Sequence, residues 1–174
     1  MQGFEDVVIQ QQRKVHSFAH YFLGSPEEAE DVTQEVFLKL WQNWASVDQE
    51  RVRPWLLRVT RNACYDRLRR RRSTSRVIDG NADPEILETS PGTAPGPEAD
   101  ARHAAFRRDI EAELQNLGEP YRSILILREI QGLRYREISE ILDLPLNTVR
   151  VYIHRGRRRL REQLAGRYDS VAIV

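Results

Sequence analysis

A segment rich in proline, glycine and acidic residues divides the chain and limits what it can fold into. Residues 77–100 hold four prolines, three glycines and six acidic residues, and no lysine or arginine. This composition is typical of an extended linker, because proline and glycine interrupt regular structure. It leaves two pieces, 1–76 and 101–174, of a chain of 174 residues. We therefore expect two small domains, each able to bury only a modest core.

Helical spacing of apolar residues dominates both pieces, and no stretch shows the two-residue alternation of strands. The first piece predicts helices over 4–22, 26–44 and the stretch PWLLRVTRNACYDRLRRRR at 54–72. Ser25 is expected to cap the second of these, with Glu28 closing a capping box. The second piece predicts helices over 102–117, 120–131 and 135–143, and a last one to about residue 164 that Asn147 caps. The expected fold class is all-α.

The formal net charge of +1 hides a sharp separation of charge along the chain. Residues 1–50 carry three basic residues against nine acidic ones, whereas residues 51–72 carry nine arginines against one acid. Residues 147–167 carry seven arginines against one acid. Two basic segments in a nearly neutral protein predict two separate anion-binding surfaces. The alternative is that both are solvated helix faces.

Two short helices around a tight turn, the second of them basic, form a helix-turn-helix pattern. Ile138, Ile141 and Leu142 are expected to pack the first helix, and Val149 and Ile153 the second. The outward face of the second helix is then expected to enter a DNA major groove. Arginine at its N-terminal end suits guanine edges, whereas the arginines further along suit phosphates. A plain helical hairpin is the alternative.

The candidate residues for this duplex contact all lie on the last predicted helix. They are Asn147, Thr148, Arg150, Val151, Tyr152, His154, Arg155, Arg158 and Arg159.

The helix predicted over 54–72 has one apolar face and one face that mixes arginines with an aromatic ring and an amide. The apolar face, expected in the core, holds Leu56, Leu57, Val59, Thr60, Ala63, Cys64 and Leu68. The candidate binding face holds Trp55, Arg58, Arg61, Asn62, Tyr65, Asp66 and Arg69. Phosphate binding needs only the charges, whereas a ring and an amide suit unstacked bases. The alternative is that Trp55 and Tyr65 are packing at the edge of a small core.

With one piece suited to duplex DNA and the other to single strands, the sequence resembles the extracytoplasmic-function (ECF) group of bacterial sigma factors. AEDVTQEVFL at 29–38 resembles the group's region 2.2, and PWLLRVTRN at 54–62 resembles regions 2.3 to 2.4. GLRYREI at 132–138 and NTVR at 147–150 resemble region 4.2. Motifs in this order across a linker are specific, whereas a lone helix-turn-helix would not be. The resemblance implies a transcription initiation factor with region 2 over 1–76 and region 4 over 101–174.

The resemblance implies that the helix over 26–44 docks on core RNA polymerase. Its apolar residues Val36, Phe37, Leu38, Leu40, Trp41 and Trp44 are too many for one buried stripe, so we expect part of this set to face a partner. The alternative is that all six fill a large core. The candidate polymerase contacts are Asp31, Gln34, Glu35, Phe37, Leu38 and Trp41.

For promoter DNA, the resemblance implies that region 4 reads the −35 element as duplex. Region 2 would melt and hold the −10 element, with Asn62 and the loop 45–53 lining a pocket for a flipped base. The two elements lie about two helical turns apart, or roughly 70 Å. An anti-sigma factor is a further expected partner. Asn147 and the pair Val151 and Tyr152 depart from the usual pattern, which puts the promoter sequence in doubt.

Other classes of protein explain less of the chain. A stand-alone helix-turn-helix repressor would leave the first piece without a role, and an RNA-binding protein would leave the helix-turn-helix without one. We expect no enzyme, cofactor or metal site: His16 and His20 lack a third ligand, and Cys64 falls on a core face. A single cysteine fits a reducing cytoplasm.

Overall fold

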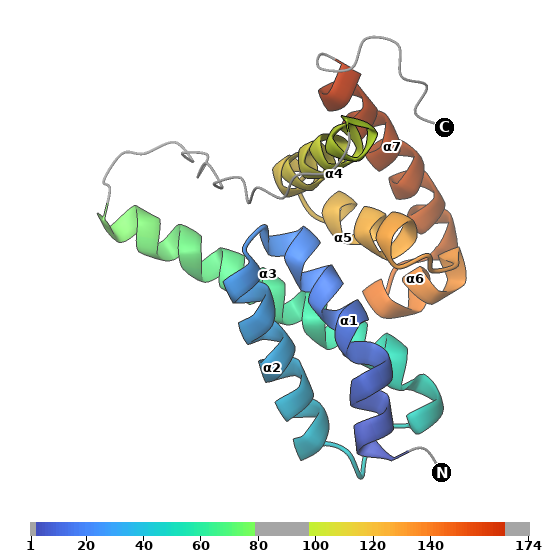
Figure 1. Cartoon of the computed structure of the whole chain (residues 1–174). Helices are drawn as coiled ribbons and strands as arrows, with labels where there is room; N and C mark the ends of the chain where they lie inside the picture. Colours follow the sequence, from blue (N-terminus) through green and yellow to red (C-terminus); the bar gives the residue numbers. More distant parts are fainter. Residues whose placement is uncertain (1–2, 79–97, 166–174) are drawn as a thin grey trace.

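The computed structural model describes residues 3–78 and 98–165, and the regular elements in these ranges are all helical (Figure 1). The first piece contains α1 (Phe4–Leu23), α2 (Pro26–Gln42), a 3-10 turn η1 (Gln49–Arg51) and α3 (Val52–Ile78). The second contains α4 (Glu98–Asn116), α5 (Tyr121–Leu125), a π-helical turn η2 (Ile126–Ile130), α6 (Tyr135–Leu142) and α7 (Leu146–Ala165). The all-α prediction is confirmed for the described residues.

Two helices extend into the segment that composition marked as a linker. α3 continues to Ile78 and α4 begins at Glu98, whereas residues 79–97 of the predicted linker lie outside the described residues. The boundaries of the two flanking helices therefore lie inside the segment predicted as a linker.

The turn between α1 and α2 follows the predicted signals, with one exception. Gly24 ends α1 in the left-handed region at a φ of 71°, and its N–H donates to the carbonyl of His20. The Ser25 hydroxyl accepts from the backbone N–H of Glu28 at 3.3 Å, as predicted for a cap. The Glu28 carboxylate does not close a capping box: it pairs with Arg71 of α3, because the guanidinium is a stronger partner than a backbone N–H.

The second piece departs from prediction inside one helix and at the start of another. The helix predicted over 120–131 consists of α5 followed by the wider turn η2, which ends before Gly132 at a φ of 66°. Asp143 ends α6 in the left-handed region, at a φ of 53°. α7 begins at Leu146, so Asn147 lies inside its first turn and the prediction that it caps the helix is wrong.

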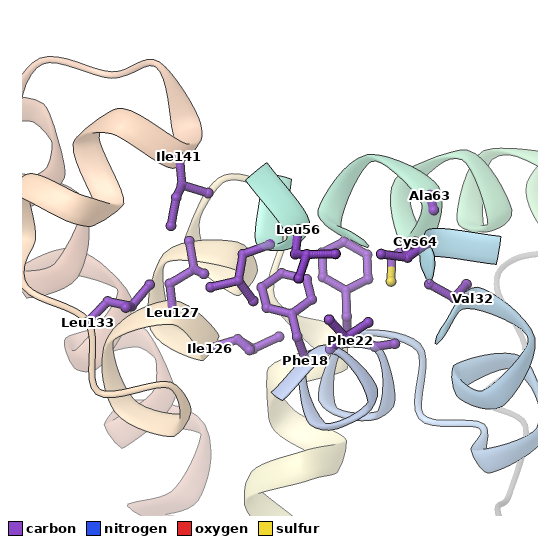
Figure 2. Packing of buried hydrophobic residues seen from close by; sticks show 14 of the residues in the cluster. Phe18, Phe22, Val32, Leu56, Ala63, Cys64, Ile126, Leu127, Leu133 and Ile141 are labelled. Atoms are coloured by element: carbon purple, nitrogen blue, oxygen red, sulfur yellow. The ribbon is translucent and has the colours of Figure 1, made fainter. Parts of the chain in front are cut away.

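The two pieces pack directly against each other. α1, α2 and α3 form one bundle, α5, α6 and α7 form a second, and α1 contacts α4 and η2 while α3 contacts α6 (Figure 1). Figure 2 shows Phe18 and Leu56 of the first piece beside Ile126 and Leu127 of the second. All four side chains are fully buried. The apolar core is therefore continuous across both pieces.

A buried arginine adds polar bonds to this shared core. Nε of Arg122 donates to the carbonyls of Leu114 and Leu117 at 3.1 Å, and Nη2 donates to that of Gln115. Nη1 reaches the carbonyl of Phe22 at the end of α1, at 3.2 Å. The last carbonyls of a helix have no partner inside the helix. Arg122 thus donates to carbonyls at the ends of both α4 and α1 with one side chain.

Candidate nucleic-acid and protein interfaces

The helix-turn-helix forms as the apolar pattern predicts. Ile138 and Ile141 of α6 are buried, as are Val149 and Ile153 of α7. Gly156, further along α7, is also buried, and a Cβ there would lie 3.2 Å from Cγ of Leu125. A glycine at this point allows α7 to approach α5 closely. The opposite face of α7 is left to solvent.

The predicted duplex contacts occupy this solvent face. The exposed ones are Asn147, Arg150, Val151, His154, Arg155, Arg158 and Arg159, and the half-buried ones are Thr148 and Tyr152.

An aromatic pair joins the middle of α7 to α5. The rings of Tyr121 and Tyr152 meet edge to face at 5.3 Å, and the guanidinium of Arg159 lies 4.2 Å from the centroid of Tyr121. Cation–π contact of this kind restrains a long side chain that would otherwise be mobile. Sequence reasoning missed the role of Tyr121, because it precedes Arg159 by more than thirty residues and only tertiary packing joins them.

On the predicted core face of α3, Leu56, Leu57, Thr60, Ala63 and Cys64 are buried, whereas Val59 and Leu68 are half-buried and pack on the core. On the opposite face, the exposed residues are Arg58, Asn62, Tyr65, Asp66 and Arg69, and the half-buried ones are Trp55 and Arg61.

Arg61 is the centre of this opposite face of α3. Its guanidinium lies 5.9 Å from the ring centroid of Tyr65, and its Nη1 donates to Oδ1 of Asn62 at 3.4 Å. Tyr65 is 46% exposed, so its ring is not edge packing of the core. Arg69 approaches Asp66 at 3.9 Å. We call Arg58, Arg61, Asn62, Tyr65 and Arg69 the α3 face.

Two other arginines of the same basic stretch have structural roles. Arg67 pairs with Asp31 of α2 at 3.1 Å, and Arg71 pairs with Glu28 while Nη1 points to the carbonyl of Leu23. These contacts fasten α3 to the helices beside it. The high charge of residues 51–72 is therefore divided between a solvent face and the bundle itself.

One stripe of α2 is uncovered, and the helix itself lies beside α1 and α3, away from α5, α6 and α7 (Figure 1). Asp31, Gln34, Leu38 and Trp41 are exposed and Glu35 is half-buried; they follow one another at helical spacing, and we call them the α2 stripe. Leu38 is 57% exposed and Trp41 63% exposed, whereas Val36 and Leu40 are fully buried. The alternative that all six apolar residues fill the core is wrong.

Aromatic contacts hold part of the α2 stripe in position. Phe4 of α1 meets the ring of Trp41 at 5.0 Å and that of Trp44 at 5.4 Å, both edge to face. Phe37 is half-buried and packs on the core. Glu35 pairs with Lys39 at 2.7 Å. The stripe is thus an apolar patch with acceptors at one end, which suits a protein partner.

Comparison with known proteins identifies the family. Residues 7–74 match the family described as Sigma-70 region 2, and residues 107–160 match Sigma-70, region 4. The chain is 34% identical over 171 residues to the ECF RNA polymerase sigma factor SigW of Bacillus subtilis, covering 93% of this chain and 89% of that protein. The chain belongs to the ECF RNA polymerase sigma factors. Members of this family are transcription initiation factors that direct RNA polymerase to promoters.

Two further similarities agree with this assignment. The ECF sigma factor SigE of Mycolicibacterium smegmatis is 34% identical over 172 residues; the match covers 99% of this chain, and the chain spans 65% of that protein's length. The solved structure of the sigma factor RpoE from Bartonella quintana, in complex with the anti-sigma factor NepR, has the same fold. It superposes with a TM-score of 0.75 at 22% identity, over 97% of this chain and 100% of that one.

A cavity of about 470 Å³ lies where the loop before α3 meets α6. Its walls are Asn43, Ser46, Val47, Asp48, Arg51, Pro54, Trp55, Arg58, Glu140 and Ile141. The loop 45–53 contributes to it, as the ECF resemblance implies for a base pocket. Asn62 is not among its walls and lies one helical turn beyond Arg58. The cavity therefore joins the loop to the start of the α3 face and not to its centre.

The histidines and the cysteine form no metal or nucleophile site in the described part of the chain. The rings of His16 and His20 are parallel at 6.3 Å, and the described residues contain no group of three metal-ligating side chains. His20 pairs instead with Glu111 of α4 at 3.7 Å, and the hydrogen bond to Glu111 raises the pKa of the imidazole. Burial raises the pKa of the Cys64 thiol, so it stays protonated. None of the described helices combines the length and apolar character of a membrane span.

Proposed function

We propose that this ECF sigma factor uses three of its helices for polymerase binding and promoter recognition. The α2 stripe binds core RNA polymerase, α7 reads the −35 element in the major groove, and the α3 face captures the non-template strand of the melted −10 element. The observation that carries the proposal is the α3 face itself. An exposed ring and amide among arginines are suited to unstacked bases and their phosphates, and they share one chain with a helix-turn-helix.

The matches to Sigma-70 region 2 and to Sigma-70, region 4 support the assignment of region 2 to residues 1–76 and of region 4 to 101–174, with a linker between them. An anti-sigma factor is the proposed regulator. A protein of similar structure, the sigma factor RpoE from Bartonella quintana, was solved in complex with such a partner, the anti-sigma factor NepR. The protein acts in the cytoplasm, beside the polymerase, and needs no cofactor or catalytic group of its own.

A stand-alone helix-turn-helix regulator is the competing function. It accounts for α6 and α7, but it gives no role to the α2 stripe. Leu38 and Trp41 together expose a large apolar surface that an isolated regulator does not need. The exposed aromatic and amide of the α3 face are also unnecessary for binding a closed duplex.

Run-off transcription with purified core polymerase and a library of promoter sequences separates the two functions. A sigma factor co-purifies with core enzyme and yields transcripts from a defined subset of the library. A protein that shifts duplex DNA tightly on its own, never associates with core enzyme and yields no transcripts would be a regulator of the competing class.

A further inference from the structure

Three consecutive arginines in the second half of α7 differ in their partners. Arg157 pairs with Glu129 of η2 at 2.8 Å, and Arg158 pairs with Glu162, one turn further along α7, also at 2.8 Å. Arg159 is exposed and makes no ion pair with any carboxylate of the described residues. Among these three arginines, Arg159 therefore carries the charge that remains available to an outside anion.

Two aromatic rings hold Arg159 in place. Its guanidinium carbon lies 4.2 Å from the ring centroid of Tyr121 at the start of α5. The ring of Tyr152 meets that of Tyr121 at 5.3 Å and 69°, and both tyrosines are half-buried and pack on the core. Because the Tyr121 ring is neutral, its contact restrains the guanidinium without neutralising the positive charge.

The position of Arg159 on α7 suits a phosphate better than a base edge. With an advance of about 100° per residue, Val151 points away from the buried Val149 and Ile153, and Arg159 lies about 80° to one side of it. An α-helix with its side chains is about as wide as the major groove, roughly 12 Å. A side chain on the flank of such a helix therefore faces the phosphates along the wall of the groove.

We propose that Tyr121 is a positioning residue for DNA binding, whose ring holds the guanidinium of Arg159 where it binds a backbone phosphate beside the −35 element. Tyr152, expected from the sequence to contact the duplex, supports the Tyr121 ring from behind. An arginine side chain loses conformational entropy when it binds, and a ring that already restrains it reduces this loss. The inference rests on the proposed binding of the −35 element by α7.

The test uses the full chain assembled with core polymerase, and a labelled promoter duplex that the wild type selects from the promoter library. Arg159→Ala should bind this duplex about fivefold more weakly, which is the scale of one exposed ion pair. It should also reduce the slope of log affinity against log salt concentration by about 0.9, the contribution of one phosphate. Arg157→Ala is the matched control and should change both quantities less, because the Arg157 guanidinium is already paired with Glu129.

Two variants of Tyr121 test the role of the ring. Tyr121→Leu removes the ring and should weaken binding about twofold to fivefold, the scale of one exposed cation–π contact, whereas Tyr121→Phe keeps the ring and should bind as the wild type does. Combined with Arg159→Ala, Tyr121→Leu should have no further effect, because no guanidinium remains for the ring to hold. An equal loss with and without Arg159 would overturn the proposal, and so would a loss from Tyr121→Phe as large as that from Arg159→Ala.

A chemical change in the DNA gives a second measurement that leaves the protein core intact. Single phosphates beside the −35 element are replaced one at a time by neutral methylphosphonates. At one or two positions the replacement should weaken binding of the wild type and have no effect on Arg159→Ala. If the two proteins respond alike at every position, Arg159 contacts no phosphate there and the proposal is wrong.

Arg150→Ala separates failure of this inference from failure of the proposed function. If Arg150→Ala relaxes base preference in the −35 element while Arg159→Ala changes neither affinity nor salt dependence, α7 reads the element and the role assigned to Tyr121 is wrong. If neither variant alters binding to the promoter duplex, α7 does not bind the −35 element and this inference fails with it.

Discussion

Shortening Leu38 to alanine should weaken binding to core RNA polymerase without unfolding the protein. Leu38 lies in the α2 stripe, and the polymerase is the partner proposed to cover it. Full burial of a leucine side chain contributes about 1.5–3 kcal/mol. Because 57% of the residue is still exposed, about half of that, or about 1–2 kcal/mol, remains to be gained at an interface. The Kd for core polymerase is therefore expected to rise about fivefold to thirtyfold.

Surface plasmon resonance with immobilised core enzyme measures this loss, and Ile9→Ala is the matched control. Ile9 lies on α1 and is 76% exposed, so the change also removes an exposed aliphatic side chain. Thermal melts should show little change for either variant, whereas Leu40→Ala, at a fully buried position of the same helix, should lower the free energy of unfolding by about 2–5 kcal/mol. Equal core affinity of Leu38→Ala and Ile9→Ala would refute the assignment of the α2 stripe.

Three further predictions concern DNA and pH. Arg150→Ala should relax preference at one or two base pairs of the −35 element and cost about 1–3 kcal/mol, whereas Arg158→Ala should weaken all sequences alike, as measured by competition with mutated sites at several salt concentrations. Tyr65→Ala should reduce initiation from duplex promoters more than from a promoter with a pre-melted −10 bubble, because stacking on one ring contributes about 1–3 kcal/mol to holding the strand. The hydrogen bond to Glu111 raises the pKa of His20 above its usual 6.5. The pair should therefore stabilise the fold fully below pH 6.5 and lose its effect as the pH rises through the raised pKa. Denaturant unfolding at several pH values should show this dependence, and Glu111→Gln should abolish it.

The local features of the fold were predictable from the sequence, because they depend on near neighbours. The apolar spacing of α3 predicted which residues are buried, and Ser25 predicted the start of α2. The surplus of apolar residues on α2 predicted an uncovered patch, which Leu38 and Trp41 form. Each of these signals involves residues that are close in the sequence. A helix cap extends over about four residues, and apolar spacing over a few helical turns.

The features that join distant parts of the chain were not predictable in the same way. Glu119 and Arg61 are far apart in the sequence, and no periodic pattern connects them. A segment with the composition of a linker also gave no indication that the two pieces share one core. The error at Asn147 has a local cause: a good capping residue is also tolerated in the first turn, where its side chain here accepts from Arg150 at 3.4 Å.

The buried guanidinium of Arg122 couples the unfolding of the two halves. It donates to a carbonyl at the end of α1 and to carbonyls at the end of α4, so melting the first half alone leaves the buried charge of Arg122 short of an acceptor. A buried donor without a partner costs about 1–3 kcal/mol, and more when it is charged. With its two pieces packed on one core, the molecule should therefore melt in one cooperative transition, whereas separated pieces would melt independently.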